Sequence, residues 1–137
     1  MDRIALKYNQ NYFYNRDIKQ EVAKFNLPSL ALIRELYGYN TAVAYLMVQL
    51  QTLNEFCGKR ISMTEAQMES IADIILQEYP HVTLPRLLAF FHFFKAGRYG
   101  IFYGDIDPMK ITSSLHEWFN KDMHKVIKDY NDSVKAV

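Results

Sequence analysis

The chain has 137 residues, which is the usual length of one domain. Half of these residues are hydrophobic and 15% are aromatic, a composition that excludes an intrinsically disordered protein. Sixteen basic and fifteen acidic residues leave a net charge of +1, so no overall field attracts nucleic acid or acidic membranes. A single cysteine, Cys57, excludes a disulfide framework and a cysteine-based zinc site.

The first 27 residues give a weak pattern. Residues 9–15 are polar and aromatic with little helix propensity, whereas residues 17–25 predict a short helix through Ile18, Val22 and Phe25. The beginning of the chain has no apolar signal region, and no run approaches the ~18 apolar residues that cross a bilayer. We therefore expect no membrane contact and a cytoplasmic location, with segment 1–27 less regular than the rest.

Two helices are predicted between Pro28 and Gly58. The first has an apolar stripe and ends at Gly38, a typical residue after a helix; its stripe is Leu30, Ile33, Leu36 and Tyr37. The second begins at residue 40 or 41 and ends at Cys57. Its first half is apolar on every side, which predicts the central helix of the fold; the residues concerned include Ala42, Ala44, Tyr45 and Val48.

Three further helices follow, each with a start signal. Residues 62–67 contain two overlapping capping boxes, Ser62 with Glu65 and Thr64 with Gln67, and Pro80 stops the helix that they begin. Thr83 caps the next helix, which ends at Gly97. Asp107 and Pro108 begin the last helix, whose stripe is Ile111, Leu115, Trp118, Phe119 and Val126. No strand pattern is present, so we expect one all-α domain, a compact bundle of five to six helices.

A segment rich in glycine and tyrosine lies between the last two predicted helices. It interleaves three glycines with aromatic and basic side chains, which suits a loop that binds a ligand or nucleic acid. The candidate binding residues are Lys95, Arg98, Tyr99, Phe102 and Tyr103. The structural interpretation, which we favour, is a helix connector whose buried rings close the end of the bundle.

A second candidate surface is the run of lysines on the last helix, at Lys121, Lys125 and Lys128. Their spacing places them on one helix face, where Asp122 and Asp129 supply the opposite sign, and a solvated face explains them best. Arg34 forms a smaller basic cluster if it adjoins Lys59 and Arg60.

No catalytic or metal-binding pattern accompanies these surfaces. The four histidines lack the spacing of metal ligands on a helix, and His92 is expected to be a half-buried helix residue. Cys57 ends an apolar stripe, where cysteine is usually a small buried hydrophobe. We therefore expect a protein that is not an enzyme and that needs no cofactor or metal.

Three runs carry a resemblance: "PSLALIRELYG", "MTEAQMESIADIILQEYPHVTLPRLLAFF" and "KAGRYGIFYGDIDPMKI". Over Pro28 to Phe119 the chain resembles an uncharacterised family of small helical proteins associated with Bacteroidetes chromosomes, their mobile elements and their phages. It departs from the family pattern at Leu32, where the family has an acid, and at Asn120 and Lys121, where the family often has "ER". The resemblance carries over no functional residue, but it implies a phage or mobile-element setting inside a bacterial cell.

Three functions remain open at this point. The first is a non-enzymatic protein-interaction module, such as an accessory or loader factor that contacts the DNA replication machinery, with a replicative helicase as one conceivable partner by analogy. The second is weak nucleic-acid binding through the glycine–tyrosine segment and the last helix. The third is a structural component of a virion or conjugation apparatus. The sequence leaves the oligomeric state open.

Overall fold

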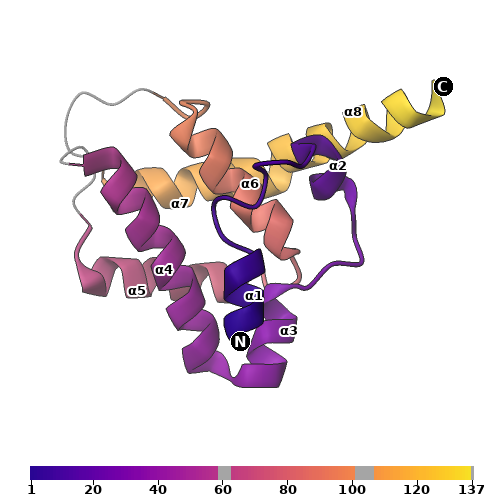
Figure 1. Ribbon diagram of the computed structural model, residues 1–137. Coiled ribbons are helices and arrows are strands. Elements are labelled where there is room, and N and C mark those ends of the chain that lie inside the picture. The colour runs from indigo at the N-terminus through magenta and orange to yellow at the C-terminus, as the bar shows by residue number, and fades with distance from the viewer. Residues whose placement is uncertain (59–62, 101–106, 137) are drawn as a thin grey trace.

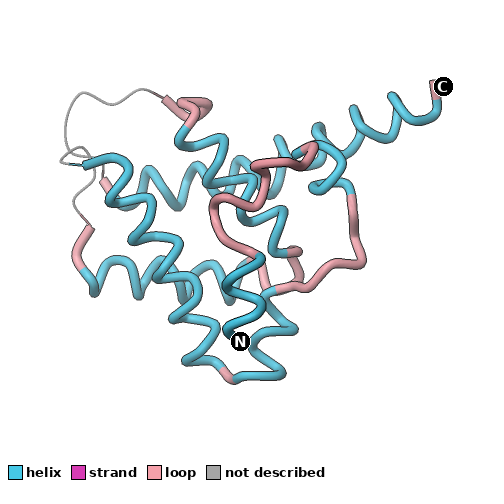
Figure 2. Tube along the Cα trace, in the orientation of Figure 1, coloured by secondary structure: helices cyan, strands magenta, loops and turns pink. Residues whose placement is uncertain are grey.

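The computed structural model describes residues 1–58, 63–100 and 107–136, and its regular elements in these ranges are all helical. They are α1 (Asp2–Lys7), α2 (Ile18–Ala23), α3 (Leu30–Tyr37), α4 (Tyr39–Cys57), α5 (Glu65–Glu78), α6 (Leu84–Lys95), α7 (Pro108–Glu117), a π-helical turn (Trp118–Asp122) and α8 (Met123–Lys135). The last three form one continuous helix (Figures 1 and 2). The all-α prediction is confirmed. Helix α1, which the sequence pattern did not reveal, adds to the expected five or six helices.

The capped starts predicted for the last three helices are confirmed where the structure describes them, whereas α4 begins at Tyr39 rather than at residue 40 or 41. Thr64 and Gln67 form a reciprocal capping box at the beginning of α5, whereas Ser62 lies outside the described residues. The Thr83 hydroxyl accepts the Arg86 N–H at the beginning of α6, and the Asp107 carboxylate accepts the Met109 N–H at the beginning of α7. Each cap satisfies a backbone donor that has no partner within the helix.

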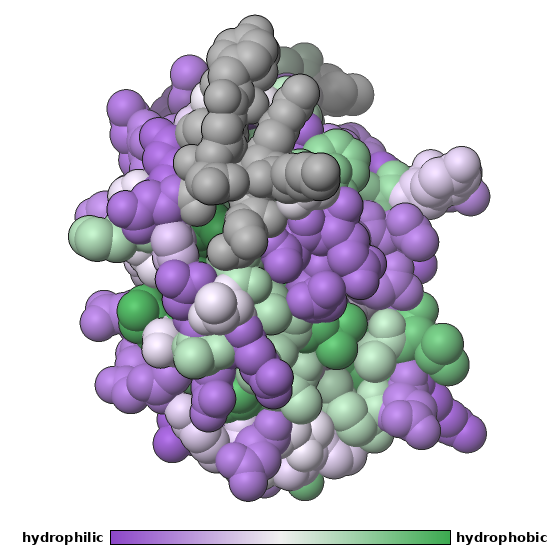
Figure 3. Space-filling model, turned by 90° about the vertical axis from the view of Figure 1, so that its left-hand side faces the viewer, coloured by the Kyte–Doolittle hydropathy of each residue, from purple (hydrophilic) through white to green (hydrophobic). Residues whose placement is uncertain are grey.

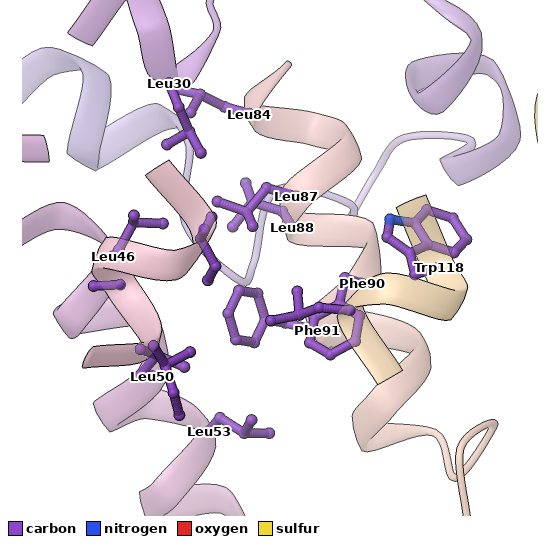
Figure 4. Packing of buried hydrophobic residues seen from close by; sticks show 14 of the residues in the cluster. Leu30, Leu46, Leu50, Leu53, Leu84, Leu87, Leu88, Phe90, Phe91 and Trp118 are labelled. Carbon is purple, nitrogen blue, oxygen red and sulfur yellow. The ribbon is translucent and has the colours of Figure 1, made fainter. Parts of the chain in front are cut away.

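The core lies where α6 passes between α4 and the long C-terminal helix. Helix α6 buries leucine and phenylalanine side chains on several sides, and the Trp118 indole covers it from the C-terminal helix (Figure 4). The largest fully buried side chains are Trp118, Phe90, Phe91, Leu30, Ile33, Leu46, Leu50, Leu53, Ile75, Leu76 and Leu84. Residues from nearly every helix therefore share one hydrophobic cluster.

The N-terminal segment is attached to this core by tyrosines and by backbone hydrogen bonds. Tyr8 is buried, and its carbonyl accepts the Tyr45 hydroxyl at 2.7 Å. In α2, Val22 is fully buried and its carbonyl accepts the Arg86 Nε–H at 2.8 Å. The predicted role of Phe25 in this helix is wrong: α2 ends at Ala23, the next residue is extended, and Phe25 is 85% exposed.

The predicted stripes of α3 and α4 fail at particular positions. Leu36 and Tyr37 are 59% and 42% exposed, because Gly38 reverses the chain at φ 93° and leaves this hairpin at the lower edge of the molecule (Figure 1). In α4, Val48 is 59% exposed and Ala44 is also exposed. One side of helix α4 is therefore buried in the core, and another side is exposed to solvent.

Candidate interaction surfaces

Tyr99 anchors the beginning of the glycine–tyrosine segment. Its side chain is buried, with ring centroids 5.9 Å from Phe90 and 6.4 Å from Phe94. Its hydroxyl donates to Asp122 Oδ2 at 2.9 Å. Burial, together with this hydrogen bond, raises the pKa of Tyr99 above its ordinary value. The expected burial of Tyr99 is confirmed, whereas Phe102 and Tyr103 lie outside the described residues.

We expect Tyr99→Phe to lower the free energy of unfolding by about 1–2 kcal/mol, because the carboxylate of Asp122 loses its buried donor while the ring packing is kept. Tyr130→Phe is the matched control, since Tyr130 is only partly buried and its hydroxyl forms no hydrogen bond with the described residues. Urea unfolding measures both variants. Equal stability of the two variants would show that the Tyr99–Asp122 contact contributes nothing.

A Schellman motif fixes the position of Arg98 directly after α6. Gly97 has φ 86°, its N–H donates to the Phe94 carbonyl at 3.1 Å, and the Arg98 N–H donates to the Phe93 carbonyl at 3.0 Å. The Arg98 guanidinium then lies 4.0 Å from the centroid of the Phe93 ring. Phe93 in turn packs 5.3 Å from Trp118. The guanidinium is therefore held on a ring that the core itself positions.

Two further basic residues lie in the last turn of α6, shortly before Arg98, and we call His92, Lys95 and Arg98 the α6 basic cluster. Lys95 Nζ lies 5.4 Å from the centroid of the Phe56 ring, and burial lowers the pKa of Lys95. His92 is exposed rather than half-buried as expected, although one side of its ring meets Phe13. Partial desolvation, and then the charges of Lys95 and Arg98, lower the pKa of His92. The positive charges of Lys95 and Arg98 therefore both act on the His92 ring.

The lysines of the C-terminal helix differ from the α6 basic cluster in their exposure and in their partners. Lys121, Lys125 and Lys128 are all exposed, and Lys128 pairs with Asp132 at 2.7 Å. Asp122, which we expected to balance this face, instead accepts the Tyr99 hydroxyl. These observations agree with a solvated face.

The second small basic cluster is only partly described. The Arg34 guanidinium lies 5.3 Å from the centroid of the Tyr39 ring, and the Tyr39 hydroxyl donates to Asp73. Lys59 and Arg60 lie outside the described residues, so their expected proximity to Arg34 stays a prediction. The hydrogen bond from Tyr39 to Asp73 does connect the α3–α4 hairpin to α5.

A groove of about 610 Å³ runs between α4 and α5, and we call it the α4–α5 groove. Its walls are Met47, Val48, Gln51, Thr52, Glu55, Met63, Glu65 and Met68. Met63 and Met68 are buried and form the floor, whereas Val48 stands exposed at the edge. Glu55 and Glu65 are exposed at the rim. The groove therefore combines an apolar, methionine-lined floor with two acidic side chains.

A second groove, of about 540 Å³, lies on the other flank of α5 and is bounded by α7. Ile74 and Met109 line it and are 42% and 73% exposed. Hydrophobic residues also gather on the face shown in Figure 3, below the atoms drawn in grey. Neither groove was predicted from the sequence; for the α4–α5 groove, the available signal was the apolar pattern on every side of the first half of α4.

A buried carboxylate on α2 was also missed. Glu21 is buried, accepts the Tyr12 hydroxyl and pairs with Lys24 at 2.5 Å and Arg16 at 3.9 Å. Burial by itself would raise the pKa of Glu21, but the hydrogen bonds from Lys24 and Tyr12 lower it below its ordinary value. All of its partners come from the N-terminal segment, so this cluster organises that segment rather than forming an open site.

Within residues 1–58, 63–100 and 107–136, no group of three or more histidine, cysteine or acidic side chains is placed to hold a metal ion. None of the helices in these ranges combines the length and the hydrophobicity that a bilayer span requires. Cys57 is partly exposed rather than buried as expected, because it lies in the last turn of α4.

Fold and surface together define a small all-α protein that presents two apolar grooves beside α5 and a basic cluster at the end of α6. The model of a family of unknown function, DUF6633, matches residues 62–137, more than half of the chain, and the chain belongs to this family. The match includes α5, α6 and the C-terminal helix but not α4. No curated protein and no solved structure matches the chain. The predicted membership of an uncharacterised family is confirmed.

Proposed function

We propose that the protein is a non-enzymatic protein-interaction module whose α4–α5 groove binds an amphipathic helix of a partner protein. The observation that carries this proposal is the exposed Val48, which stands beside a methionine floor at the end of the half of α4 that is apolar on every side. Such a helix is normally buried all round. A partner that covers Val48 would bury the apolar surface of α4 that the chain itself leaves exposed.

The lining of the groove defines the chemistry of that partner. Methionine side chains are flexible and polarizable, and they adapt to the apolar face of a docked helix. Glu55 and Glu65 at the rim favour a partner helix whose flanks carry lysine or arginine, because complementary charge selects and orients partners. We therefore expect a basic amphipathic helix with apolar residues at positions i, i+3 or i+4, and i+7.

The biological setting is part of the proposal and rests on the resemblance of the sequence to helical proteins of Bacteroidetes, their mobile elements and their phages. In that setting the module acts in the bacterial cytoplasm as an accessory or loader factor for phage or mobile-element DNA replication. A role of this kind needs a docking surface and no chemistry of its own, which agrees with the two grooves beside α5.

The test is Val48→Arg, which removes an apolar contact and places a positive charge in the acidic groove. Synthetic amphipathic peptides with basic, neutral or acidic flanks are the probes, and fluorescence anisotropy measures their binding. We expect the basic peptides to bind the unmodified protein and to bind the variant about tenfold more weakly, because burying one valine contributes at least that factor.

Val134→Arg is the matched control, because Val134 is 54% exposed at the far end of α8 and lies outside the groove. The control substitution should leave peptide affinity unchanged. Equal losses in both variants, or a preference for acidic peptides, would contradict the proposed groove. Binding of a second copy of this chain, detected by sedimentation and abolished by Val48→Arg, would replace the partner helix with a self-interface.

A further inference from the structure

We propose that the α6 basic cluster and the exposed ring of Phe56 form a binding site for single-stranded nucleic acid. Lys95 and Arg98 would contact backbone phosphates, His92 would extend the basic surface, and Phe56 would stack on a base. This inference is independent of the proposed partner helix, because none of these residues lines the α4–α5 groove.

The cationic groups are held in place before any ligand arrives. The Schellman motif and the Phe93 ring fix the backbone and the guanidinium of Arg98, as described above. Lys95 is the last residue of α6, and its ammonium lies over Phe56 at the end of α4. A pre-organised cation loses less conformational freedom on binding an anion than a mobile surface lysine does.

Among the described residues, the cations of the cluster form no ion pair with an acidic side chain. Within the described residues, ion pairs join Arg16 and Lys24 to Glu21 and Lys128 to Asp132, and none includes Lys95 or Arg98. The charges acting on His92 are those of Lys95 and Arg98, both of the same sign. The cluster is thus a local concentration of positive charge on a chain whose net charge is only +1. Such a concentration attracts phosphate groups.

The aromatic ring distinguishes single-stranded nucleic acid from other phosphate ligands. Phe56 is 62% exposed, so much of its ring is accessible to a ligand. Alternation of cations with aromatic rings is the arrangement that binds single strands, where phosphates meet the cations and unstacked bases meet the rings. The competing explanation is that basic residues at the end of α6 only complement the helix dipole.

Fluorescence anisotropy with a labelled oligo-dT strand, measured over a series of salt concentrations, tests the proposal. Arg98→Met keeps an apolar cover over Phe93 while removing the charge, and Lys95→Met does the same above Phe56. We expect each to weaken binding about fivefold or more and to reduce the slope of log affinity against log salt by about 0.7, as expected for one lost phosphate contact. Phe56→Leu should weaken binding about tenfold through the loss of stacking.

Two matched controls make the same kinds of substitution at positions outside the proposed site. Lys128→Met removes an exposed lysine of the C-terminal helix, and Phe25→Leu removes a ring that is 85% exposed. Neither should change the affinity. No binding of oligo-dT at low salt, or an equal effect of Lys128→Met and Lys95→Met, would overturn the site. Equal binding of a duplex together with no effect of Phe56→Leu would overturn its single-strand character.

Discussion

Replacing Trp118 with alanine is expected to lower the free energy of unfolding by about 4 kcal/mol, within the range for truncating a buried aromatic side chain. Trp118 is fully buried, its ring packs 5.3 Å from Phe93, and its indole Nε1–H donates to the Arg86 carbonyl at 2.9 Å. The substitution removes the side chain that joins α6 to the C-terminal helix. Chemical denaturation followed by circular dichroism measures the change.

Trp118→Phe separates the two contributions of this side chain. Phenylalanine keeps most of the apolar contact but removes the hydrogen bond from the indole to the Arg86 carbonyl, so we expect a smaller loss, of about 1–2 kcal/mol. A loss of less than about 1 kcal/mol in the alanine variant would show that Trp118 is not a core residue, and the packing in Figure 4 would be wrong.

Glu21→Gln is expected to lower the free energy of unfolding by about 2 kcal/mol. The amide has the shape of the acid and still accepts the Tyr12 hydroxyl, but it loses the charge that pairs with Lys24 and Arg16. Both cations are partly exposed, so the solvent screens part of their attraction. Glu35→Gln, at an exposed position of α3, is the control and should be neutral.

The Glu21 contribution should also depend on pH. The folded state lowers the pKa of Glu21 below its ordinary value of 4.5, so the unfolded state takes up a proton first as the pH falls. The stabilisation is therefore complete above pH 4.5 and is lost in more acidic solution. The stability difference between the unmodified protein and Glu21→Gln should shrink below that pH. A difference that stayed constant into acid would contradict the charged state of Glu21.

Much of the fold could be predicted because its signals are local. Capping residues such as Thr64, Thr83 and Asp107 act within one helix turn, and glycines such as Gly38 end helices through their own backbone conformation. Periodicity in the last helix likewise placed Trp118 in the core. These features need no knowledge of which helices meet.

The candidate sites were harder to predict because they depend on contacts between distant segments. In the sequence, Glu21 looks like an ordinary surface acid. It is buried because Tyr12 and the rest of the N-terminal segment fold over it. The α4–α5 groove arises from the crossing of two helices, and the pattern of α4 alone predicted that Val48 would be buried. The failure at Val48 is itself informative, because it marks apolar surface that the chain does not cover.

Photo-crosslinking from position 48 tests the proposed partner helix most directly. A photoreactive amino acid replaces Val48 in one protein and Val134 in another, and each is irradiated in the native host before the crosslinked peptides are sequenced. We predict that position 48 alone captures one recurrent segment, and that this segment has the apolar spacing of a helix and lysine or arginine on its flanks. Capture of the same segments from both positions, or of an acidic segment from position 48, would contradict the account.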